Sequence, residues 1–248
     1  KCAERDQLRI CGDLISANLY QIEKGSTVVS LQNFYEPDAP LVKIKLDPSK
    51  TPSQNAQKYY KDYRKARTAE EKLTEQIGQA QQELEYLDTV FEELSRAKVE
   101  RDLSEIRQEL VEQGYIRAQK GKQKPVAAAA PLEFTSSDGF RILVGRNNRQ
   151  NDRLTLKQAN NNDIWLHTKN IPGSHTILVT DGREPTETAI REAAMLAAAH
   201  SRARDSSQVP VDYTQVRNVN KPSGAKPGMV IYVKYNTVYV TPAASEEV

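Results

Sequence analysis

The sequence predicts an α/β (α+β) fold, in which a long helical coiled-coil arm precedes a mixed-sheet domain. The arm is predicted because residues 54–114 contain no proline and space their apolar residues in heptads. The sheet is predicted because residues 132–243 hold short runs of alternating apolar and polar residues, separated by turn residues. One Ala-rich helix, over residues 186–201, accompanies that sheet.

The chain of 248 residues divides into four predicted parts. Residues 1–50 are predicted to be the C-terminal end of a domain whose earlier part is missing from this sequence, and the arm follows over 51–116. A basic, low-complexity linker covers 117–131, and the mixed-sheet domain covers 132–248. The chain begins with Lys rather than Met and shows no signal peptide, so we expect it to be part of a longer protein.

The arm is predicted as a helix over 54–95, with Ser53 as its N-cap, and a shorter helix over 102–113 that turns back against it. The seam positions of the long helix are Tyr59, Tyr63, Ala66, Glu70, Leu73, Ile77, Ala80, Leu84, Leu87, Phe91 and Leu94. Such a seam suits either a dimerisation coil or a projecting arm that reaches a distant partner, so the sequence leaves the oligomeric state open.

Shorter elements are expected on both sides of the arm. They are a helix over 5–21, strands over 27–31 and 41–46, then strands over 132–135, 140–144, 164–168, 174–180, 209–216, 229–235 and 237–241, and a short helix over 151–159.

Charge is distributed unevenly along the chain. The formal net charge is +2, yet residues 117–248 contain 18 Lys/Arg against 12 Asp/Glu. This excess of positive charge suggests an anionic partner for the C-terminal half. No apolar run reaches ~18 residues, so no membrane span is predicted. Two cysteines, Cys2 and Cys11, fit a reducing compartment.

The most informative segment is 163–175, which holds the only Trp and two of the three His residues. Its defining residues are Asp163, Trp165, His167, Gly173, Ser174 and His175. Strand alternation puts Asp163, Trp165 and His167 on one face, and a Pro-Gly turn brings His175 near it. We expect the Asp and His side chains to bond one another or nearby backbone. Trp165 suits either a core anchor or stacking on a base.

This segment lacks the spacing of a metal or catalytic site. His167, His175 and His200 lie too far apart in sequence for the close spacing typical of zinc ligands. Ser174 and His175 are neighbours on a strand and point to opposite faces, which disfavours a nucleophile–base pair. We therefore expect no enzyme activity, no metal and no cofactor, and a hydrolase or metalloenzyme is the weakest alternative.

A loop rich in Arg and Asn follows the strand over 140–144. Arg forks suit phosphate oxygens, and Asn and Gln amides can bond bases, sugars or backbone. The residues predicted to contact RNA are Arg146, Asn147, Asn148, Arg149, Gln150, Asn151, Arg153 and, in the neighbouring motif, Lys169. The alternative is a structural loop in which Asn supports turns and Asp152 caps a helix.

Three ordered motifs in this domain resemble a known family. They are Gly145-Arg-Asn-Asn-Arg-Gln-Asn-Asp152, the segment 163–175, and Val209-Pro-Val-Asp-Tyr-Thr214 with Lys221-Pro-Ser-Gly-Ala-Lys-Pro-Gly228. Together they resemble the NFACT-R domain of the RqcH/NEMF family, also called the fibronectin-binding protein A family. The heptad segment resembles the coiled-coil middle region of that family, and residues 1–50 resemble the tail of its NFACT-N domain.

The resemblance implies ribosome-associated quality control in the cytoplasm. Its implied partners are the obstructed large ribosomal subunit, rRNA and tRNA, and the full-length family promotes C-terminal alanine tailing. A fragment like this one should bind without supporting tailing. The family also implies an alternative, a surface-exposed adhesin that binds fibronectin and reaches the cell surface without a signal peptide. No sequence feature argues for that alternative independently.

Overall fold

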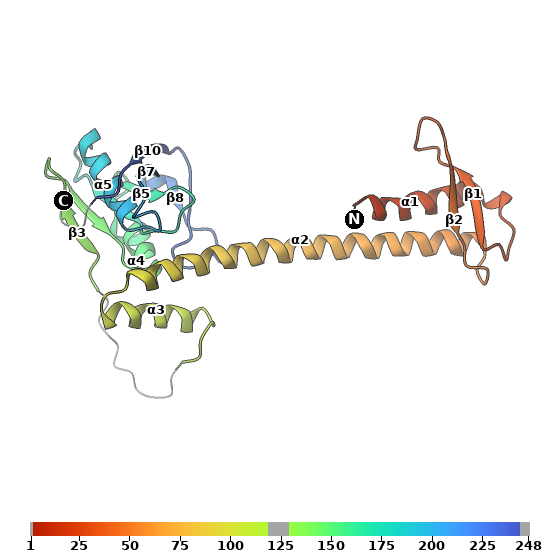
Figure 1. Cartoon of the computed structure of the whole chain (residues 1–248), viewed down its shortest axis with the longest axis horizontal. Helices are drawn as coiled ribbons and strands as arrows, with labels where there is room; N and C mark the ends of the chain where they lie inside the picture. The colour runs from red at the N-terminus through yellow and green to blue at the C-terminus, as the bar shows by residue number, and fades with distance from the viewer. Residues whose placement is uncertain (1, 119–128, 244–248) are drawn as a thin grey trace. The chain divides into compact units, whose positions relative to one another are not determined.

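The computed structural model describes residues 2–118 and 129–243 and divides into two compact units, residues 1–81 and 82–248. The division falls inside α2, the helix that runs Pro52–Arg96 (Figure 1). The predicted class, a long helix followed by a domain with a sheet, is confirmed. Most of the predicted linker, residues 119–128, lies outside the described residues.

The first unit combines two helices and a hairpin. It contains α1 (Cys2–Ala17), the 3-10 turn η1 (Leu19–Gln21), the antiparallel strands β1 (Val28–Gln32) and β2 (Leu41–Lys45), and the first part of α2. Its core consists of Leu14, Ile15, Ile22, Leu31, Ile44, Leu46 and Ala56. The hydroxyl of Tyr60 donates to Asp13 at 2.7 Å, and Arg5 pairs with Glu70 at 2.6 Å, so α1 lies antiparallel along α2.

Helix α2 begins one residue before the predicted cap. Thr51, not Ser53, caps it: the Gln54 amide donates to Thr51 Oγ1 at 3.2 Å, and the Gln54 side chain accepts from the Thr51 amide at 2.9 Å. This reciprocal pair is a capping box. Pro52 fits the first helical position, where its missing N–H has no intrahelical partner to lose. The prediction of Ser53 as N-cap was therefore wrong.

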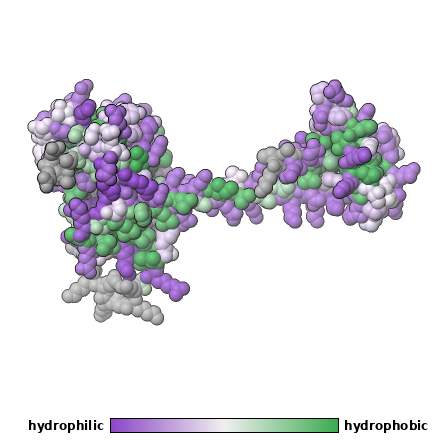
Figure 2. Space-filling view, viewed as in Figure 1, coloured by the Kyte–Doolittle hydropathy of each residue, from purple (hydrophilic) through white to green (hydrophobic). Residues whose placement is uncertain are grey.

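In the second unit the end of α2 packs against α3 (Glu100–Glu112), as predicted for the shorter helix. Tyr86, Val90 and Ile106 are buried between them. Much of the seam is uncovered in this chain, since Leu84 is 66% and Phe91 67% exposed, and Figure 2 shows apolar atoms along this helix.

Six strands of the second unit form one sheet. They are β3 (Leu132–Thr135), β4 (Arg141–Val144), β5 (Ile164–Thr168), β6 (Thr176–Val179), β7 (Val209–Gln215) and β10 (Asn236–Val240), in the order β10-β7-β5-β6-β4-β3. Each neighbouring pair is antiparallel, so the described sheet lacks the mixed strand directions that the sequence suggested and the α+β description applies. Helix α5 (Glu187–Ala199) covers one face of this sheet and buries its alanines there.

The opposite face carries short elements. They are α4 (Asn148–Arg153), a π-helical turn (Leu154–Gln158), the 3-10 turn η3 (Val216–Asn218), and the pair β8 (Val219–Asn220) and β9 (Ile231–Tyr232). The strand predicted over 229–235 is thus reduced to two residues and pairs outside the main sheet. The backbone turns just beyond it at Lys234, whose φ is +52°.

Candidate functional site

Strand β5 lies in the middle of the sheet and carries the motif that the sequence singled out. Ile164 and Leu166 face the core under α5, whereas Trp165 belongs to the separate cluster on the opposite face, as the alternation predicted. Trp165 is only 1% exposed. It is therefore a core anchor of that face, and it offers no exposed surface ring for stacking.

Asp163 fixes the start of β5. One carboxylate oxygen accepts from the backbone amide of Thr180 at 2.9 Å and from its hydroxyl at 3.1 Å. The other oxygen accepts from the Asn160 amide at 2.8 Å. A carboxylate with these donors needs no counter-ion, because hydrogen bonds stabilise its charge. Asp163 thus bonds nearby backbone, one of the two outcomes expected, and does not bond either histidine.

His175 is held by both ring nitrogens. Nε2 lies 3.1 Å from the carbonyl of Gly228 and must donate to it, so Nδ1 accepts from the hydroxyl of Thr155 at 2.8 Å. Burial is the main cause that lowers the pKa of His175, to about 3. The ring is therefore neutral near pH 7, and it joins β6 to the loop before β9.

Three aromatic rings meet above the sheet. The Trp165 and His167 rings lie 5.8 Å apart and nearly parallel, and the His175 ring meets both edge-on, at 5.3 and 5.6 Å. Burial also lowers the pKa of His167. Tyr232 closes this cluster, with its ring centroid 4.7 Å from that of Trp165.

The Pro-Gly turn of the motif is tightly packed. A Cβ on Gly173 would lie 2.8 Å from the Cβ of Ser201 and 2.9 Å from Thr168 Oγ1, so only glycine fits there. Ser174 is buried, and its hydroxyl donates to the carbonyl of Gly145 at 2.5 Å while accepting from Arg96 at 2.9 Å. A hydroxyl committed in this way is not poised as a nucleophile.

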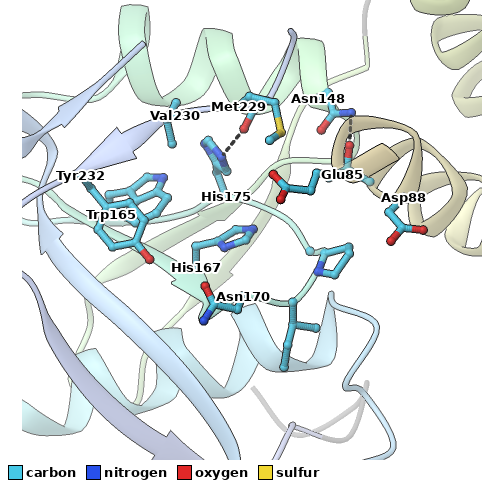
Figure 3. A pocket seen from close by; sticks show the side chains of 15 residues that line it. Glu85, Asp88, Asn148, Trp165, His167, Asn170, His175, Met229, Val230 and Tyr232 are labelled. Carbon is cyan, nitrogen blue, oxygen red and sulfur yellow. Dashed lines mark hydrogen bonds between the residues drawn. The ribbon is translucent and has the colours of Figure 1, made fainter. Parts of the chain in front are cut away.

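A cavity of about 460 Å³ opens beside the aromatic cluster. Trp165 and His175 form its buried part, and Tyr232 and Met229 lie on its wall (Figure 3). Its outer part carries exposed polar residues, including Glu85 from α2. Sequence reasoning placed Trp165, His167 and His175 together but missed the contributions of β9 and α2, which carry no local signal of a site.

The amide side chains of the Arg/Asn loop face inward. Asn147 caps α4 by accepting from the Gln150 amide at 2.9 Å, and its own amide donates to Glu105 of α3. Asn148 donates to Thr89 Oγ1 at 2.8 Å. Asn148 also donates to Glu109 at 3.3 Å. Gln150 donates to the Ala129 carbonyl at 2.6 Å and accepts from the Arg146 amide at 2.7 Å, and Asn151 accepts from the His175 amide at 3.2 Å. The loop therefore fastens the two helices to the sheet domain.

The cations of the RNA-contact prediction are more accessible. Arg146 lies 3.9 Å from Asp102 and Arg149 lies 3.4 Å from Glu112, and both side chains stay about one-third exposed. Arg153 is exposed. Lys169 lies 3.5 Å from Asp212 and 4.9 Å from the centre of the Tyr235 ring. RNA contact through these residues stays a prediction.

A second cavity, of about 620 Å³, lies where the end of α2 meets α5 and β3. Four basic side chains line it, Arg96, Lys98, Arg146 and Arg204, against two carboxylates, Asp102 and Asp205. Arg204 and Arg96, which sequence reasoning did not select, share the buried carboxylate of Glu92. Their basic character was visible in the sequence, but their convergence depends on the packing of α2 against the sheet domain.

Within residues 2–118 and 129–243, no group of three or more His, Cys, Asp or Glu side chains is arranged to hold a metal ion. Within the same ranges, no helix is both long enough and apolar enough to cross a membrane.

Two family models match successive parts of the chain. The sequence model of the NFACT N-terminal and middle domains matches residues 1–128, and that of the NFACT protein RNA binding domain matches residues 131–234. These matches define a protein with an NFACT middle region ahead of an NFACT-R domain. The chain belongs to the NFACT family, and the predicted RqcH/NEMF resemblance is confirmed.

Particular relatives agree with this assignment. The chain is 49% identical to the Rqc2 homolog RqcH of Bacillus subtilis over 96% of its own length, and 39% identical to that of Streptococcus suis over 93%. It spans about two fifths of the length of these relatives (42% and 41%). Its fold matches the C-terminal part of the fibronectin/fibrinogen-binding protein of Streptococcus suis with a TM-score of 0.73 at 34% identity, covering 98% of this chain and 90% of that one.

Proposed function

We propose that this chain is the RNA-binding part of a ribosome-associated quality control factor that acts in the cytoplasm. The observation that carries the proposal is the match of residues 131–234 to the NFACT RNA binding domain, in a chain whose relatives are named RqcH. The proposed partners are the obstructed large ribosomal subunit, its rRNA and tRNA. The chain would bind these partners without catalysing a reaction.

The accessible cations of the NFACT-R domain support this proposal. Arg153 and Lys157 lie one helical turn apart and are exposed on the face opposite α5. Guanidinium and ammonium groups bind RNA phosphates largely by releasing counterions. These two residues, rather than the buried amides of the same segment, are the sharper test of an RNA-facing surface.

The test is co-sedimentation of the chain with large ribosomal subunits that carry peptidyl-tRNA. The expected result is binding that weakens steeply as salt is raised. Arg153→Glu combined with Lys157→Glu should weaken binding about 10-fold or more, because two favourable charges become repulsive. Absence of binding at every salt concentration would contradict the proposal.

The matched control is Arg191→Glu, an exposed charge reversal on α5, on the other face of the sheet. It changes the net charge by the same amount per substitution and should leave binding nearly unchanged. An equal loss in both variants would point to nonspecific charge attraction and would remove the assignment to the Arg153 surface.

Fibronectin binding is the second candidate, favoured only by the structural match to the streptococcal fibronectin/fibrinogen-binding protein. Binding to immobilised fibronectin that resists RNase and persists at physiological salt would support it. Binding that disappears after RNase treatment would instead show that RNA carries the interaction.

A further inference from the structure

The exposed apolar side chains of the sheet domain gather in one segment. In the described part of residues 129–243, five large apolar or aromatic side chains are exposed, and four of them lie between residues 231 and 239. These four are Ile231, Val233, Tyr235 and Tyr239. Apolar groups that gather at a surface often mark an interaction site. The segment that ends in β10 is therefore a candidate binding surface.

Two of these side chains, Tyr235 and Tyr239, lie on the face of the sheet opposite α5. Val240 packs in the core under α5, so Tyr239, the residue before it, points the other way. The Tyr235 ring lies 5.2 Å from the ring of Tyr232, which packs in the apolar cluster of that opposite face. Tyr239 is 61% and Tyr235 45% exposed, and β10 is an edge strand of the sheet. Both rings are therefore accessible from solvent.

Ammonium groups accompany the two rings. Nζ of Lys169 lies 4.9 Å from the centre of the Tyr235 ring and donates to the hydroxyl of Thr237 at 3.3 Å. Lys234, the residue before Tyr235, is exposed. The carboxylate that pairs with Lys169, that of Asp212, is only 1% exposed and also accepts from the Thr237 hydroxyl at 2.6 Å. The charge that this surface presents to solvent is therefore positive.

We propose that these side chains bind single-stranded RNA. The tyrosine surface is defined as Tyr235, Tyr239, Lys169 and Lys234. Each ring stacks on one unpaired base, and the ammonium groups bind the phosphates that join the bases. Other RNA-binding domains use aromatic side chains on a sheet face in this way. The inference rests on the RNA-binding function proposed above, and it names both the surface and the kind of RNA.

Single-stranded RNA fits the tyrosine surface better than an RNA duplex or a protein. In a duplex the bases are stacked on one another, so rings on a sheet do not reach their faces. The centre of a protein interface favours tyrosine but is depleted in lysine, whereas here Lys169 lies directly against the Tyr235 ring. Because every base has a face that can stack, binding should depend only weakly on RNA sequence.

Fluorescence anisotropy of a labelled oligouridylate, titrated with the full chain, tests the stacking. Tyr239→Ala and Tyr235→Ala should each weaken binding about 10-fold, because each removes a ring. Tyr239→Phe keeps the ring and should bind like the parent. Tyr20→Ala, at an exposed tyrosine of the first unit, is the control and should leave the affinity unchanged. Lys234→Gln removes a phosphate contact and should lower the salt dependence of binding. Because Tyr239 lies exposed on an edge strand, its variants stay informative if Tyr235→Ala fails to fold.

Parallel co-sedimentation with large ribosomal subunits separates this inference from the proposed function. If the parent binds subunits but the alanine variants bind oligouridylate as tightly as the parent does, the inference is overturned and the proposed function stands. If oligouridylate binding needs the tyrosines but the parent does not bind subunits, the inference is supported and the ribosomal function is contradicted.

Three further outcomes would overturn the inference. Equal affinity for an RNA duplex of the same length would exclude stacking on unpaired bases. An equal loss in Tyr239→Phe and Tyr239→Ala would assign the contact to the hydroxyl rather than to the ring. Alanine variants that lose subunit binding but keep oligouridylate binding would assign the tyrosine surface to a ribosomal protein.

Discussion

The guanidinium of Arg96, in the last turn of α2, donates a hydrogen bond of 2.9 Å to the hydroxyl of Ser174, 78 residues later in the chain. The same hydroxyl donates to the carbonyl of Gly145. Ser174 thus links the end of α2, the loop after β4 and the segment before β6. Ser174, although it stands next to a histidine, therefore holds the helix and the sheet domain together.

Replacing Ser174 with Ala should destabilise the second unit by about 1–3 kcal/mol, because buried groups of Arg96 and Gly145 lose their partner. Urea unfolding followed by circular dichroism measures this change. Ser223→Ala, at an exposed position, is the control and should stay within ~0.5 kcal/mol of the parent. Equal stability of both variants would show that the Ser174 link contributes little.

A substitution at Asn148 distinguishes a structural role of this side chain from a direct contact with RNA. Asn148→Ala removes the bonds to Thr89 and Glu109 and should lower the free energy of unfolding by about 2 kcal/mol. Under conditions where the variant is folded, its affinity for ribosomal subunits should match that of the parent. Weakened RNA binding with unchanged stability would instead support the direct RNA contact that the sequence predicted.

The buried carboxyl of Glu93 makes stability depend on pH. Burial, followed by the nearby charge of Glu109, raises the pKa of Glu93 well above its ordinary value of 4.5. Between 4.5 and the raised pKa the folded state holds a proton that the unfolded state has lost, so stability falls as pH rises through this window. Glu93→Gln, which carries no charge at any pH, should remove this fall.

The measurement is the difference in urea midpoint between Glu93→Gln and the parent from about pH 4 to pH 8. The variant should gain stability relative to the parent toward the upper end. Glu184→Gln, at an exposed site, should show no such trend. A constant difference across the range would mean that Glu93 is already charged in the folded protein.

His175 should stay neutral wherever the domain is folded, because burial lowers its pKa to about 3. Its ring nitrogens should therefore show the Nε2–H tautomer by NMR, without a titration between pH 5 and pH 8. Below the ordinary pKa of 6.5 the unfolded state binds a proton that the folded state does not, so this residue destabilises the fold as pH falls toward 3. A midpoint near 6.5 would show an open, solvated ring.

Local patterns in the sequence determined the elements and the family. Heptads without proline predicted α2, because a long helix needs only local hydrogen bonds and an uninterrupted chain. Strict alternation correctly divided Trp165 from Ile164 and Leu166, because side chains in a strand alternate between faces. Three motifs in order were enough to indicate the NFACT-R domain.

Tertiary structure decided what those residues do. The Asn side chains after β4 resemble an RNA-binding loop by composition, yet their amides bond Glu105, Thr89 and backbone groups that are distant in sequence. Likewise, only packing brings Glu85 of α2 and Tyr232 of β9 to the cavity beside Trp165. A sequence shows which side chains can donate a hydrogen bond, accept one or carry a charge. Which distant residue becomes the partner depends on how the helices and the sheet pack, because these contacts form only in the folded core.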